Sequence, residues 1–522
     1  MDRLITLEGL VCVPVLLPLL AAGVKLAIGG RLRRVQSFIS LCTLCVTLAV
    51  SVVLLVAADA RGPLVTDLGG WPEPIAICLV ADRLSTLVLV VSQAVTLCVM
   101  VYSVADAYDR QEHDAPMAIF HPAFLVMVAG VSNAFLSGDL FNLFVAFELL
   151  LSGSYVLLTF GGTESRIRAG ATYTLMALVS SMLFLIALAV TYAAAGTLSL
   201  AQLAVRFGGL PDQMKLLVEL TLLLAFAIKA AIFPMQAWLP DSYPTAPAPV
   251  TAVFAGLLTK VGVYSIIRLE ALLFPGGPVA SLLMWVALAT MLVGVLGAVA
   301  QTDMKRMLSF TLVSHIGYMV FGVALSTVAG LAGAVFYVVH HITVQTGLFL
   351  VAGMVERRAG TTSVNQLGGL MKATPLIAVL FFVPAMNLSG IPPMSGFLGK
   401  LMLVQAGLAS GGWPAVTLVA GGLLTSLLTL YAVAKTWAKA FWRAPRGERI
   451  GTVVESEEAT GEEPTVTTAK LPVALPLSVI ALVALGLAFT VLAGPLSALT
   501  WRAAGELMAR EPYISAVLGE VP

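Results

Sequence analysis

The chain has 522 residues, of which 59% are hydrophobic and only 11% are charged, and its mean hydropathy is +0.98. This composition excludes a water-soluble domain, and the lack of alternating ~10-residue segments excludes a membrane β-barrel. The net charge of +1 gives no indication of nucleic-acid binding.

Apolar runs long enough to cross a ~30 Å hydrocarbon layer recur along the whole chain. The pattern predicts an all-α polytopic membrane protein of about fourteen transmembrane helices. The predicted spans are residues 5–28, 35–57, 75–103, 117–136, 140–160, 170–195, 214–234, 247–270, 279–300, 306–326, 329–354, 374–408, 413–436 and 472–494.

The twelfth span is too long for one helix and too short for two helices with a loop. It contains the segment VPAMNLSGIPPMSGFLGK, and Lys400 is its only charged residue. Proline removes a backbone donor and clashes with the preceding turn, so a broken helix is predicted here. Such breaks are common where transporters bind ions.

The seventh span ends in a similar proline-rich segment, KAAIFPMQAWLPDSYPTAPAPV. Two lysine-bearing, interrupted spans indicate an internal repeat of five helices, with broken helices 7 and 12. The predicted units are N-terminal helices 1–3 in residues 1–116, a first repeat in 117–270, a second repeat in 279–436, a cytoplasmic loop in 437–471, and helix 14 with a C-terminal tail in 472–522.

Lysine and arginine are distributed unevenly between the loops of the two membrane faces. The face that carries Arg31, Arg33 and Arg34 holds about twice as many basic residues as the face that carries Arg61. Basic loops stay inside, which predicts a multi-pass membrane protein with an even number of spans and both termini outside. The acidic segment 443–470 is predicted to be a flexible cytoplasmic loop.

Five ionisable side chains lie deep in the predicted spans, where each costs about 2.5–3.5 kcal/mol at the bilayer centre. They are Glu148, Lys229, Lys260, His341 and Lys400. Such a row suits proton transfer, because burial and neighbouring charges shift the balance between the protonated and deprotonated forms. We predict that these five residues carry protons and that Glu148 pairs with Lys229 as a gate. Secondary candidates are Asp139, His315, His340 and Gln345.

Structural alternatives stay open for several polar residues. Lys25, at a helix end, is interpreted as a lysine that snorkels to the membrane surface. His315 also fits a helix–helix hydrogen bond. His341 shares a helical face with Gln345 at i, i+4, so it is favoured over His340 for the polar interior.

No sequence feature indicates a cofactor, a metal site or a catalytic residue. Cys42 and Cys45 form a CxxC pair in an apolar run, with no second pair, and the five cysteines are interpreted as small packing residues. The sequence lacks a P-loop and an iron–sulfur pattern. Energy is therefore expected from an ion gradient or a partner subunit.

Four long motifs carry a resemblance to a known family: SGDLFNLFVAFELLLSGSYVLL, KAAIFPMQAWLPDSYPTAPAPVTAVFAGLLTKVGVYSIIR, DMKRMLSFTLVSHIGYM and NLSGIPPMSGFLGKLML. The chain resembles the antiporter-like subunits shared by respiratory complex I and the Mrp multisubunit Na⁺/H⁺ antiporters. Within the family it is most similar to the D-type subunits of the Mrp antiporters. The resemblance implies fourteen helices with spans 4–8 and 9–13 as inverted repeats.

The resemblance also implies roles for individual residues. Glu148 matches a glutamate that pairs with the lysine at Lys229, and Lys260 matches a connecting lysine. His341 matches the histidine of the central polar axis, and Lys400 matches the lysine at the terminal exit. Relatives can carry a lysine where this chain has Gln345, so conduction there is expected to depend more on water.

The favoured function is a proton-translocating subunit of a hetero-oligomeric Na⁺/H⁺ antiporter, surrounded by lipid and by other Mrp subunits. The transported ion is H⁺, and whether Na⁺ also passes through this chain is left open. The alternative is a proton-pumping membrane subunit of an NADH:quinone oxidoreductase. An organic-solute symporter working alone is disfavoured, because the polar residues form a line of titratable groups and not a substrate pocket.

Overall fold

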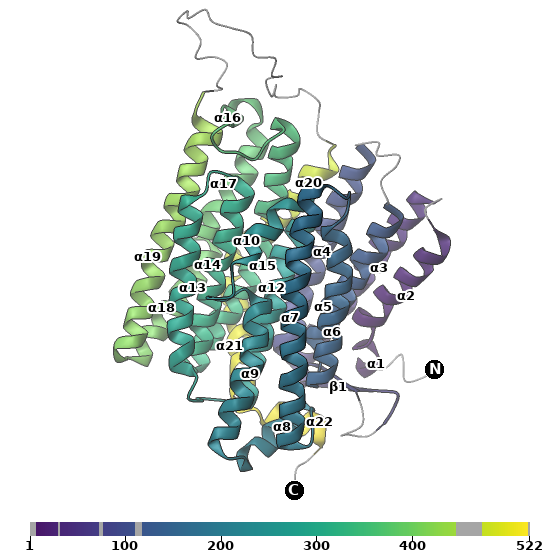
Figure 1. Ribbon diagram of the computed structural model, residues 1–522, viewed down its shortest axis with the longest axis vertical. Coiled ribbons are helices and arrows are strands. Elements are labelled where there is room, and N and C mark those ends of the chain that lie inside the picture. The colour runs from purple at the N-terminus through teal and green to yellow at the C-terminus, as the bar shows by residue number, and fades with distance from the viewer. Residues whose placement is uncertain (1–6, 30–31, 72–76, 110–116, 445–471, 520–522) are drawn as a thin grey trace, which may run out of the picture.

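The structure is a computed structural model that describes residues 7–29, 32–71, 77–109, 117–444 and 472–519. Long helices run side by side along one direction and form a single bundle (Figure 1). Within the described residues, eleven helices are long and apolar enough to cross a membrane, and Val13–Ile28 and Pro375–Ser389 are shorter apolar helices. The predicted fold class, a helical polytopic membrane protein, is confirmed, while the count of fourteen spans stays a prediction.

The described elements are mostly long helices, with one two-stranded sheet. In chain order they are α1 (Leu7–Leu10), α2 (Val13–Ile28), α3 (Arg33–Arg61), β1 (Leu64–Leu68), β2 (Ile77–Ala81), α4 (Arg83–Asp109), α5 (Met117–Leu136), α6 (Leu140–Leu158), α7 (Glu164–Ala195), α8 (Leu200–Arg206), η2 (Phe207–Gly209), α9 (Asp212–Ala230), α10 (Trp238–Ser242), η3 (Tyr243–Thr245), α11 (Ala248–Val253), η4 (Phe254–Leu258), α12 (Thr259–Arg268), η5 (Leu269–Leu273), α13 (Ala280–Ala300), α14 (Met304–Ala324), α15 (Val328–Ala359), α16 (Leu370–Ala373), α17 (Pro375–Ser389), α18 (Ser395–Ser410), α19 (Gly412–Trp437), η6 (Ala438–Trp442), α20 (Ala474–Val491), α21 (Ala493–Ala509) and α22 (Glu511–Leu518).

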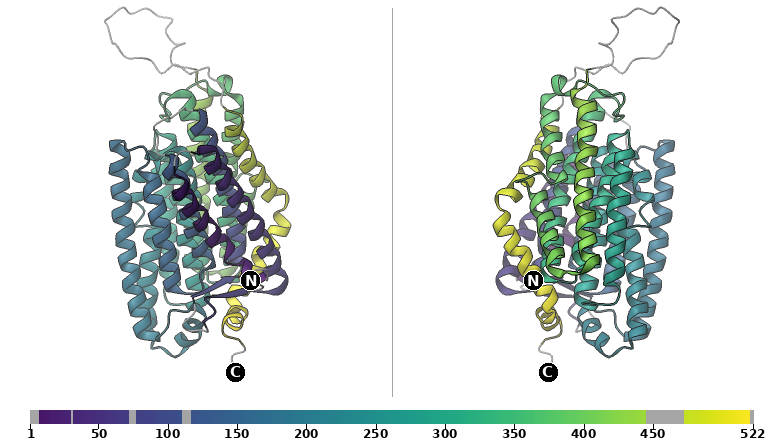
Figure 2. Two further views of the ribbon diagram at one scale, coloured as in Figure 1. Left: turned by 90° about the vertical axis from the view of Figure 1, so that its right-hand side faces the viewer. Right: turned by 90° about the vertical axis from the view of Figure 1, so that its left-hand side faces the viewer.

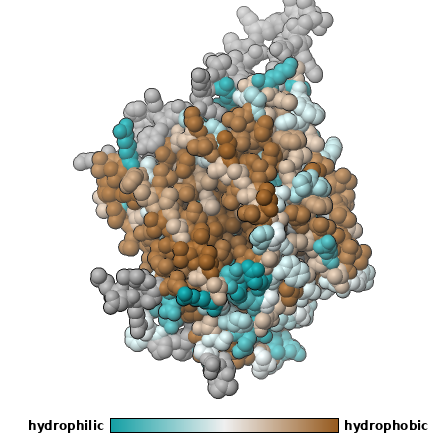
Figure 3. All heavy atoms as spheres, turned by 180° about the vertical axis from the view of Figure 1, so that it is seen from behind, coloured by the Kyte–Doolittle hydropathy of each residue, from teal (hydrophilic) through white to brown (hydrophobic). Residues whose placement is uncertain are grey.

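The outside of the bundle is apolar over most of its height. Figure 3 shows a broad hydrophobic face, with hydrophilic residues gathered mainly at its lower edge. On α7, large apolar side chains such as Leu175, Met182 and Ile186 are exposed. A surface of this kind is stable only against lipid or another apolar protein.

The helices α1 and α22 lie at the same end of the bundle, opposite α16 (Figures 1 and 2). We call these the α22 end and the α16 end. An even number of crossings places both ends of the chain on one face of the membrane. Which face this is stays a prediction, and from residue 445 to 471 the predicted cytoplasmic loop lies outside the described residues.

The predicted third span, residues 75–103, is partly wrong. Ile77–Ala81 forms strand β2, which pairs antiparallel with β1 in the register Leu64 to Ala81. The helix α4 begins only at Arg83, after Asp82 accepts a hydrogen bond from the backbone N–H of Ser85. A short apolar run such as ICLVA fits a buried strand as well as a helix, so periodicity could not separate the two.

Both predicted helix breaks are confirmed. The twelfth predicted span is divided into α17 and α18, with residues 390–394 between them in a non-helical turn. The seventh predicted span, α9, ends at Ala230, and the chain continues through a turn into the short helix α10. By contrast, residues 248–273 form one continuous helix that includes two π-helical turns, η4 and η5.

The two halves of the chain repeat one capping motif at a constant spacing. Asp139 caps α6 by accepting from Asn142 N, and Asp303 caps α14 by accepting from Arg306 N. Asp139 also forms an isolated antiparallel β-bridge with Ser199, and Asp303 forms one with Ser363. The two residues of each bridge are 60 residues apart in the sequence (199 − 139 and 363 − 303). The second motif follows the first by 164 residues (303 − 139).

The same spacing of 164 residues relates two close contacts between neighbouring helices. A Cβ atom added to Gly130 of α5 would lie 2.7 Å from Leu150 N of α6, and one added to Gly294 of α13 would lie 2.4 Å from Ser314 N of α14. A second set of contacts follows the rule, with Gly153 against Met127 and Gly317 against Met291. This correspondence is what an internal repeat produces, although the unit boundaries 117–270 and 279–436 stay predictions.

Replacing Gly294 by valine is expected to push α13 away from α14, because the new side chain meets backbone atoms that cannot rotate aside. Overpacking of this kind costs about 1–3 kcal/mol or more. We expect a lower melting temperature of the purified protein in detergent.

The matched control is Gly505→Ala in α21, where an added Cβ has no atom within 4 Å. Alanine favours the helix by up to about 1 kcal/mol over glycine, so this variant should melt at or above the temperature of the original protein. A Gly294→Val protein that melts like the original would contradict the close packing of α13 and α14.

Candidate proton-transfer site

Lys400 of α18 is held by the break in the twelfth predicted span. Its Nζ donates to the carbonyl oxygens of Leu388 and Ser389, both at 3.1 Å, and lies 5.0 Å from the centre of the Tyr318 ring. The last carbonyls of a helix have no partner within the helix and carry partial negative charge. The end of α17 therefore supplies acceptors for a buried ammonium group without any carboxylate.

Lys260 of α12 is held in a similar way by an irregular helix. Its side chain is fully buried, and its Nζ donates to the carbonyl oxygen of Ala255 at 2.5 Å. Ala255 lies in the π-helical turn η4, directly before α12. A π-helical turn disturbs the regular backbone ladder, and such turns are frequent at functional sites.

A cluster of histidine and tyrosine rings occupies the centre of the bundle between α14 and α15. The rings of His315 and His341 lie 5.3 Å apart, and Tyr337 Oη lies 2.7 Å from His315 Nδ1. His340 Nδ1 lies 3.0 Å from Ser395 Oγ, at the start of α18. These side chains are fully buried, so α15 brings both adjacent histidines into the polar interior, not His341 alone.

Several polar atoms of this cluster have no hydrogen-bond partner within the described part of the chain. They are His315 Nε2, His340 Nε2, both ring nitrogens of His341, and Gln345 Oε1. Gln345 uses its amide nitrogen to donate to Leu308 O of α14 at 2.7 Å. His341 lies close enough to Lys260 and Lys400 for both charges to act on it. The charges of both lysines therefore act on the histidine cluster.

Glu148 and Lys229 lie near each other but do not form an ion pair within 4.0 Å. Lys229 Nζ donates to Ala177 O at 3.3 Å and to Ser181 Oγ at 3.2 Å, both on α7, and lies 5.3 Å from the centre of the Phe147 ring. Glu148 is partly exposed, and its Oε1 is buried without a hydrogen-bond partner. In this arrangement the predicted pair is open.

A small cavity of about 20 Å³ lies beside Lys229. Its lining includes Phe147, Tyr173, Trp238 and Tyr243. Tyr243 Oη has no hydrogen-bond partner among the described residues, and Tyr173 Oη lies 2.7 Å from Ser154 Oγ. A cavity needs about 10–15 Å³ of this kind of space to hold a water molecule, so there is room for about one water beside the lysine.

Two interpretations made from the sequence are wrong. Lys25 does not snorkel to the surface: its side chain is fully buried and donates to Ser40 Oγ. Cys42 and Cys45 are not core residues, because both are exposed on α3. The sequence does not show which way these side chains point. Lys25 lies in the last turn of α2, and the cysteines lie in the apolar run of α3.

Four buried polar residues were missed by the sequence analysis. Tyr318 and Tyr337 link the histidine cluster to Lys400 through ring contacts. Glu219 of α9 is fully buried with both carboxylate oxygens unpaired, and Glu270 in η5 is buried with Oε1 unpaired. A search for every carboxylate inside an apolar run would have found Glu219 and Glu270.

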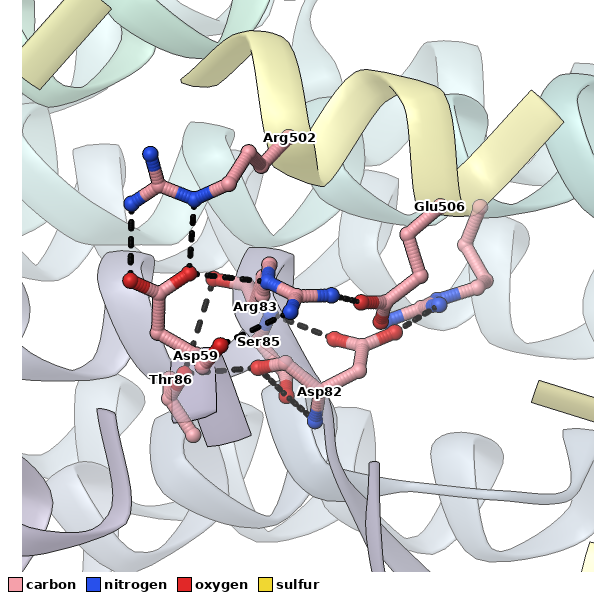
Figure 4. A network of polar contacts seen from close by, with 8 residues as sticks. Asp59, Asp82, Arg83, Ser85, Thr86, Arg502 and Glu506 are labelled. Atoms are coloured by element: carbon pink, nitrogen blue, oxygen red, sulfur yellow. Dashed lines mark hydrogen bonds and ion pairs between the residues drawn. The ribbon is translucent and has the colours of Figure 1, made fainter. Parts of the chain in front are cut away.

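A network of paired charges, shown in Figure 4, lies apart from these lysines. Asp59 accepts from Arg83 Nε at 2.9 Å and from Arg502 Nη2 at 2.7 Å, and Arg83 also pairs with Glu506. These contacts join the end of α3 and the start of α4 to α21. The network fixes the C-terminal helices against the rest of the bundle.

The same network continues to a buried ion pair between Asp82 and Arg268. Arg268 also donates to Tyr264 Oη at 2.8 Å, and the Tyr513 ring lies 5.1 Å from its guanidinium carbon. Burial alone would raise the pKa of Asp82, but the charge and hydrogen bond of Arg268 outweigh it and hold that pKa below the ordinary value. Each charge in this network has an opposite charge as its partner, whereas Lys229 has none within 4.0 Å among the described residues.

A helical membrane bundle with buried lysines on interrupted helices defines the class of ion-translocating membrane proteins. Residues 137–429 match the family described as NADH:quinone oxidoreductase/Mrp antiporter, TM. The chain belongs to this family.

Individual relatives place the chain among the antiporter members of the family. It is 36% identical over 98% of its length to the whole of the Na(+)/H(+) antiporter D subunit of Alkalihalophilus pseudofirmus, and 34% identical over 98% of its length to the whole of that of Bacillus subtilis. A chain of the Mrp complex from Dietzia sp. DQ12-45-1b superimposes with a TM-score of 0.89 at 33% identity, covering 99% of this chain and 100% of that one. A chain of respiratory complex I from Thermus thermophilus gives a TM-score of 0.76 at 24% identity, covering 96% and 99%, which shows a shared fold.

Asp139, one of the secondary candidates, is the N-cap residue of α6. Only 9% of the residue is exposed, and its Oδ2 has no hydrogen-bond partner within the described residues. Burial raises the pKa of the Asp139 carboxyl from its ordinary 3.8 to about 6, although hydrogen bonds from the backbone N–H groups of Asn142 and Phe141 oppose this. A raised carboxyl pKa means that the folded state binds the proton more tightly than the unfolded state does.

Replacing Asp139 by asparagine is therefore expected to stabilise the protein above pH 6. The penalty for ionising Asp139 is absent below about pH 4, grows as the pH rises to about 6, and is then constant at about 3 kcal/mol. Asparagine keeps the helix cap and carries no charge. Melting temperatures measured across this pH range should rise for the variant only on the alkaline side.

Asp303→Asn is the control, because Asp303 caps α14 in the same way but is less buried and also accepts from Thr362 Oγ1. Replacing Asp303 disturbs the hydrogen bond from Thr362, so that variant should melt no higher than the original protein. Equal melting of Asp139→Asn and the original protein at every pH would show that the Asp139 carboxyl is not penalised by burial.

Proposed function

We propose that this chain is the proton-translocating subunit of a hetero-oligomeric Na⁺/H⁺ antiporter, and therefore a component of a secondary transporter and not an enzyme. The observation that carries the proposal is the buried row of lysines and histidines in a chain whose full length matches proteins named as the D subunit of a Na(+)/H(+) antiporter. Its partners are the other subunits of an Mrp complex and the surrounding lipid of a prokaryotic plasma membrane, with both termini outside. No cofactor is required.

The proposed proton path runs from Lys260 through the histidine and tyrosine cluster to Lys400. In this path His341 receives a proton from the side of Lys260, whose charge acts on it across the interior. His315 and Tyr337 continue the row towards Lys400, which rests against the Tyr318 ring. The unpaired ring nitrogens support this path, because buried polar atoms ordinarily have partners and water can bridge these positions.

Glu148 and Lys229 are proposed to form the gate at the beginning of the path. The open arrangement leaves Lys229 bonded to Ala177 O and Ser181 Oγ. Closing the pair would draw Lys229 towards Glu148 and favour its charged form, and opening it would favour release of the proton.

The alternative function is a proton-pumping membrane subunit of an NADH:quinone oxidoreductase. The likeness to complex I supports only the fold, because the identity is 24%. The two functions differ in their energy source. An antiporter exchanges Na⁺ for H⁺ without NADH or quinone, whereas a component of an oxidoreductase moves protons only when electrons flow.

Replacing Lys400, Lys229 or Glu148 should stop proton movement through the assembled complex. In everted membrane vesicles without NADH or quinone, we expect Lys400→Ala, Lys229→Ala and Glu148→Gln each to lower the Na⁺-driven pH change at least about tenfold, which corresponds to ~1.4 kcal/mol in the barrier. The measurement is the fluorescence of a pH-sensitive dye after addition of NaCl.

The control is Lys215→Ala, which removes a lysine from the same helix as Lys229. Lys215 lies at the rim of the bundle and pairs only with Asp212 at 3.5 Å. Its loss should leave exchange unchanged. If the three axis variants also retain exchange while the subunits copurify normally, the proposed path is wrong.

A further inference from the structure

A second row of buried titratable side chains lies in the N-terminal helices, separate from the proposed path. Lys25 of α2 donates to Ser40 Oγ of α3, and Ser40 Oγ lies 3.1 Å from His121 Nδ1 of α5. The other ring nitrogen, His121 Nε2, lies 3.4 Å from Ser37 Oγ. The four side chains form a continuous chain of hydrogen bonds across three helices, towards the α16 end of the bundle.

The exposure of these residues changes in one direction along the row. Lys25 and Ser40 are 0% exposed, His121 is 3% exposed, and Ser37 is 7% exposed. The row therefore leads from a fully buried lysine to Ser37, its least buried member, which lies one turn from the start of α3. Ser37 and Ser40 belong to the buried face of α3, together with Thr47 and Ser51.

Lys25 lacks the partner that a structural lysine would have. Within the described residues no carboxylate lies within 4.0 Å of Lys25 or His121. The other charged groups whose side chains are described on the elements packed against α2 and α5 are exposed or have other partners. Glu8, Arg34 and Arg61 are exposed. Asp59, Arg83, Asp106 and Arg268 are in ion pairs with other residues, Lys260 donates to Ala255 O, and the charge of Glu148 acts on Lys229.

Two ordinary explanations of a lysine in a membrane helix do not fit Lys25. A lysine that only stabilises the fold either reaches the headgroup region or forms a buried ion pair. Lys25 does neither, and an unpaired charge in the membrane is costly. Its contacts are instead a hydroxyl that can both accept and donate a proton, and behind it an imidazole that can accept one.

We propose that Lys25, Ser40 and His121 form a second proton-exchange site, which connects the interior of the N-terminal helices with the surface at the α16 end. An N–H bond of the Lys25 ammonium breaks and its proton goes to Ser40 Oγ, while the original hydroxyl proton of Ser40 goes to His121 Nδ1. Lys25 becomes neutral and His121 becomes cationic, so the total charge of +1 is unchanged. His121 then gives its Nε2 proton to Ser37 Oγ, while the original hydroxyl proton of Ser37 leaves to a water molecule at the α16 end, so that His121 and Ser37 are again neutral. The reverse sequence loads Lys25.

The proposal rests on the proposed function in one respect, namely that the exchanged protons serve antiport. Ser40 is the best test, because removing its hydroxyl interrupts the row without removing a charge. Ser40→Ala should lower Na⁺-driven proton movement in vesicles at least about tenfold, since proton transfer by a positioned group contributes about 10²–10⁴-fold. His121→Asn, which keeps a side-chain amide but cannot take a proton, should act like Ser40→Ala.

Three further variants separate proton transfer from packing. Ser40→Thr keeps the hydroxyl and should restore exchange. Ser51→Ala, on the same face of α3, removes a hydroxyl that bonds only to Thr47 O at 2.7 Å, and it should have no effect. Lys25→Arg keeps the positive charge but holds its proton, so it should fail even in complexes that assemble and melt normally.

Exchange is measured in everted vesicles across a range of pH, with copurification of the other subunits and melting temperature recorded for every variant. Support requires loss in Ser40→Ala, rescue in Ser40→Thr and a changed pH profile. The proposal is overturned if Ser40→Ala and His121→Asn keep the original profile, or if a well-assembled Ser40→Thr fails equally. Lys400→Ala is run in parallel, because retained exchange in that variant would refute the proposed function itself and not only this second site.

Discussion

The cost of keeping an ammonium group away from water is the constraint on which the interior of this protein depends. A charge at the centre of a bilayer costs several kcal/mol unless the protein supplies partners. Lys400 and Lys260 find them in backbone carbonyls, at the end of α17 and in the π-helical turn η4. A regular helix would use these carbonyls within its own ladder. The irregular backbone therefore has a function of its own: it supplies the carbonyl groups that accept hydrogen bonds from the buried lysines.

Close packing of neighbouring helices follows the same spacing in both halves of the chain. Gly130 and Gly294 let neighbouring helices approach at backbone distance, and their contacts are offset by the same 164 residues (294 − 130). Small residues are the usual means of close helix contact in membranes, where the hydrophobic effect does not drive association. Asp139 and Asp303 begin the next helix in each half. The constant offset indicates that one scaffold carries two different polar interiors.

Hydropathy and proline placement were sufficient to predict the helical bundle and both broken helices, because lipid leaves few other solutions for long apolar runs. The strand Ile77–Ala81 could not be predicted, since five apolar residues have no period of their own. Ionisable residues at membrane depth identified the positions of Lys260, His341 and Lys400. Which way Lys25 and His340 point depends on how helices rotate against one another, and a single sequence does not specify this.

The described residues contain two kinds of polar network, which differ in whether their charges are paired. Around Asp59, Asp82 and Arg268, opposite charges are paired, and their role is to hold α21 and α22 against the bundle. Lys229, Lys260 and Lys400 instead contact carbonyls, hydroxyls and aromatic rings, with no ion pair. A lysine in an ion pair must break that pair before it can lose its proton, and in a medium of low dielectric constant this is expensive. A lysine held by neutral dipoles loses less when it becomes neutral, so the unpaired lysines are the ones suited to carry protons.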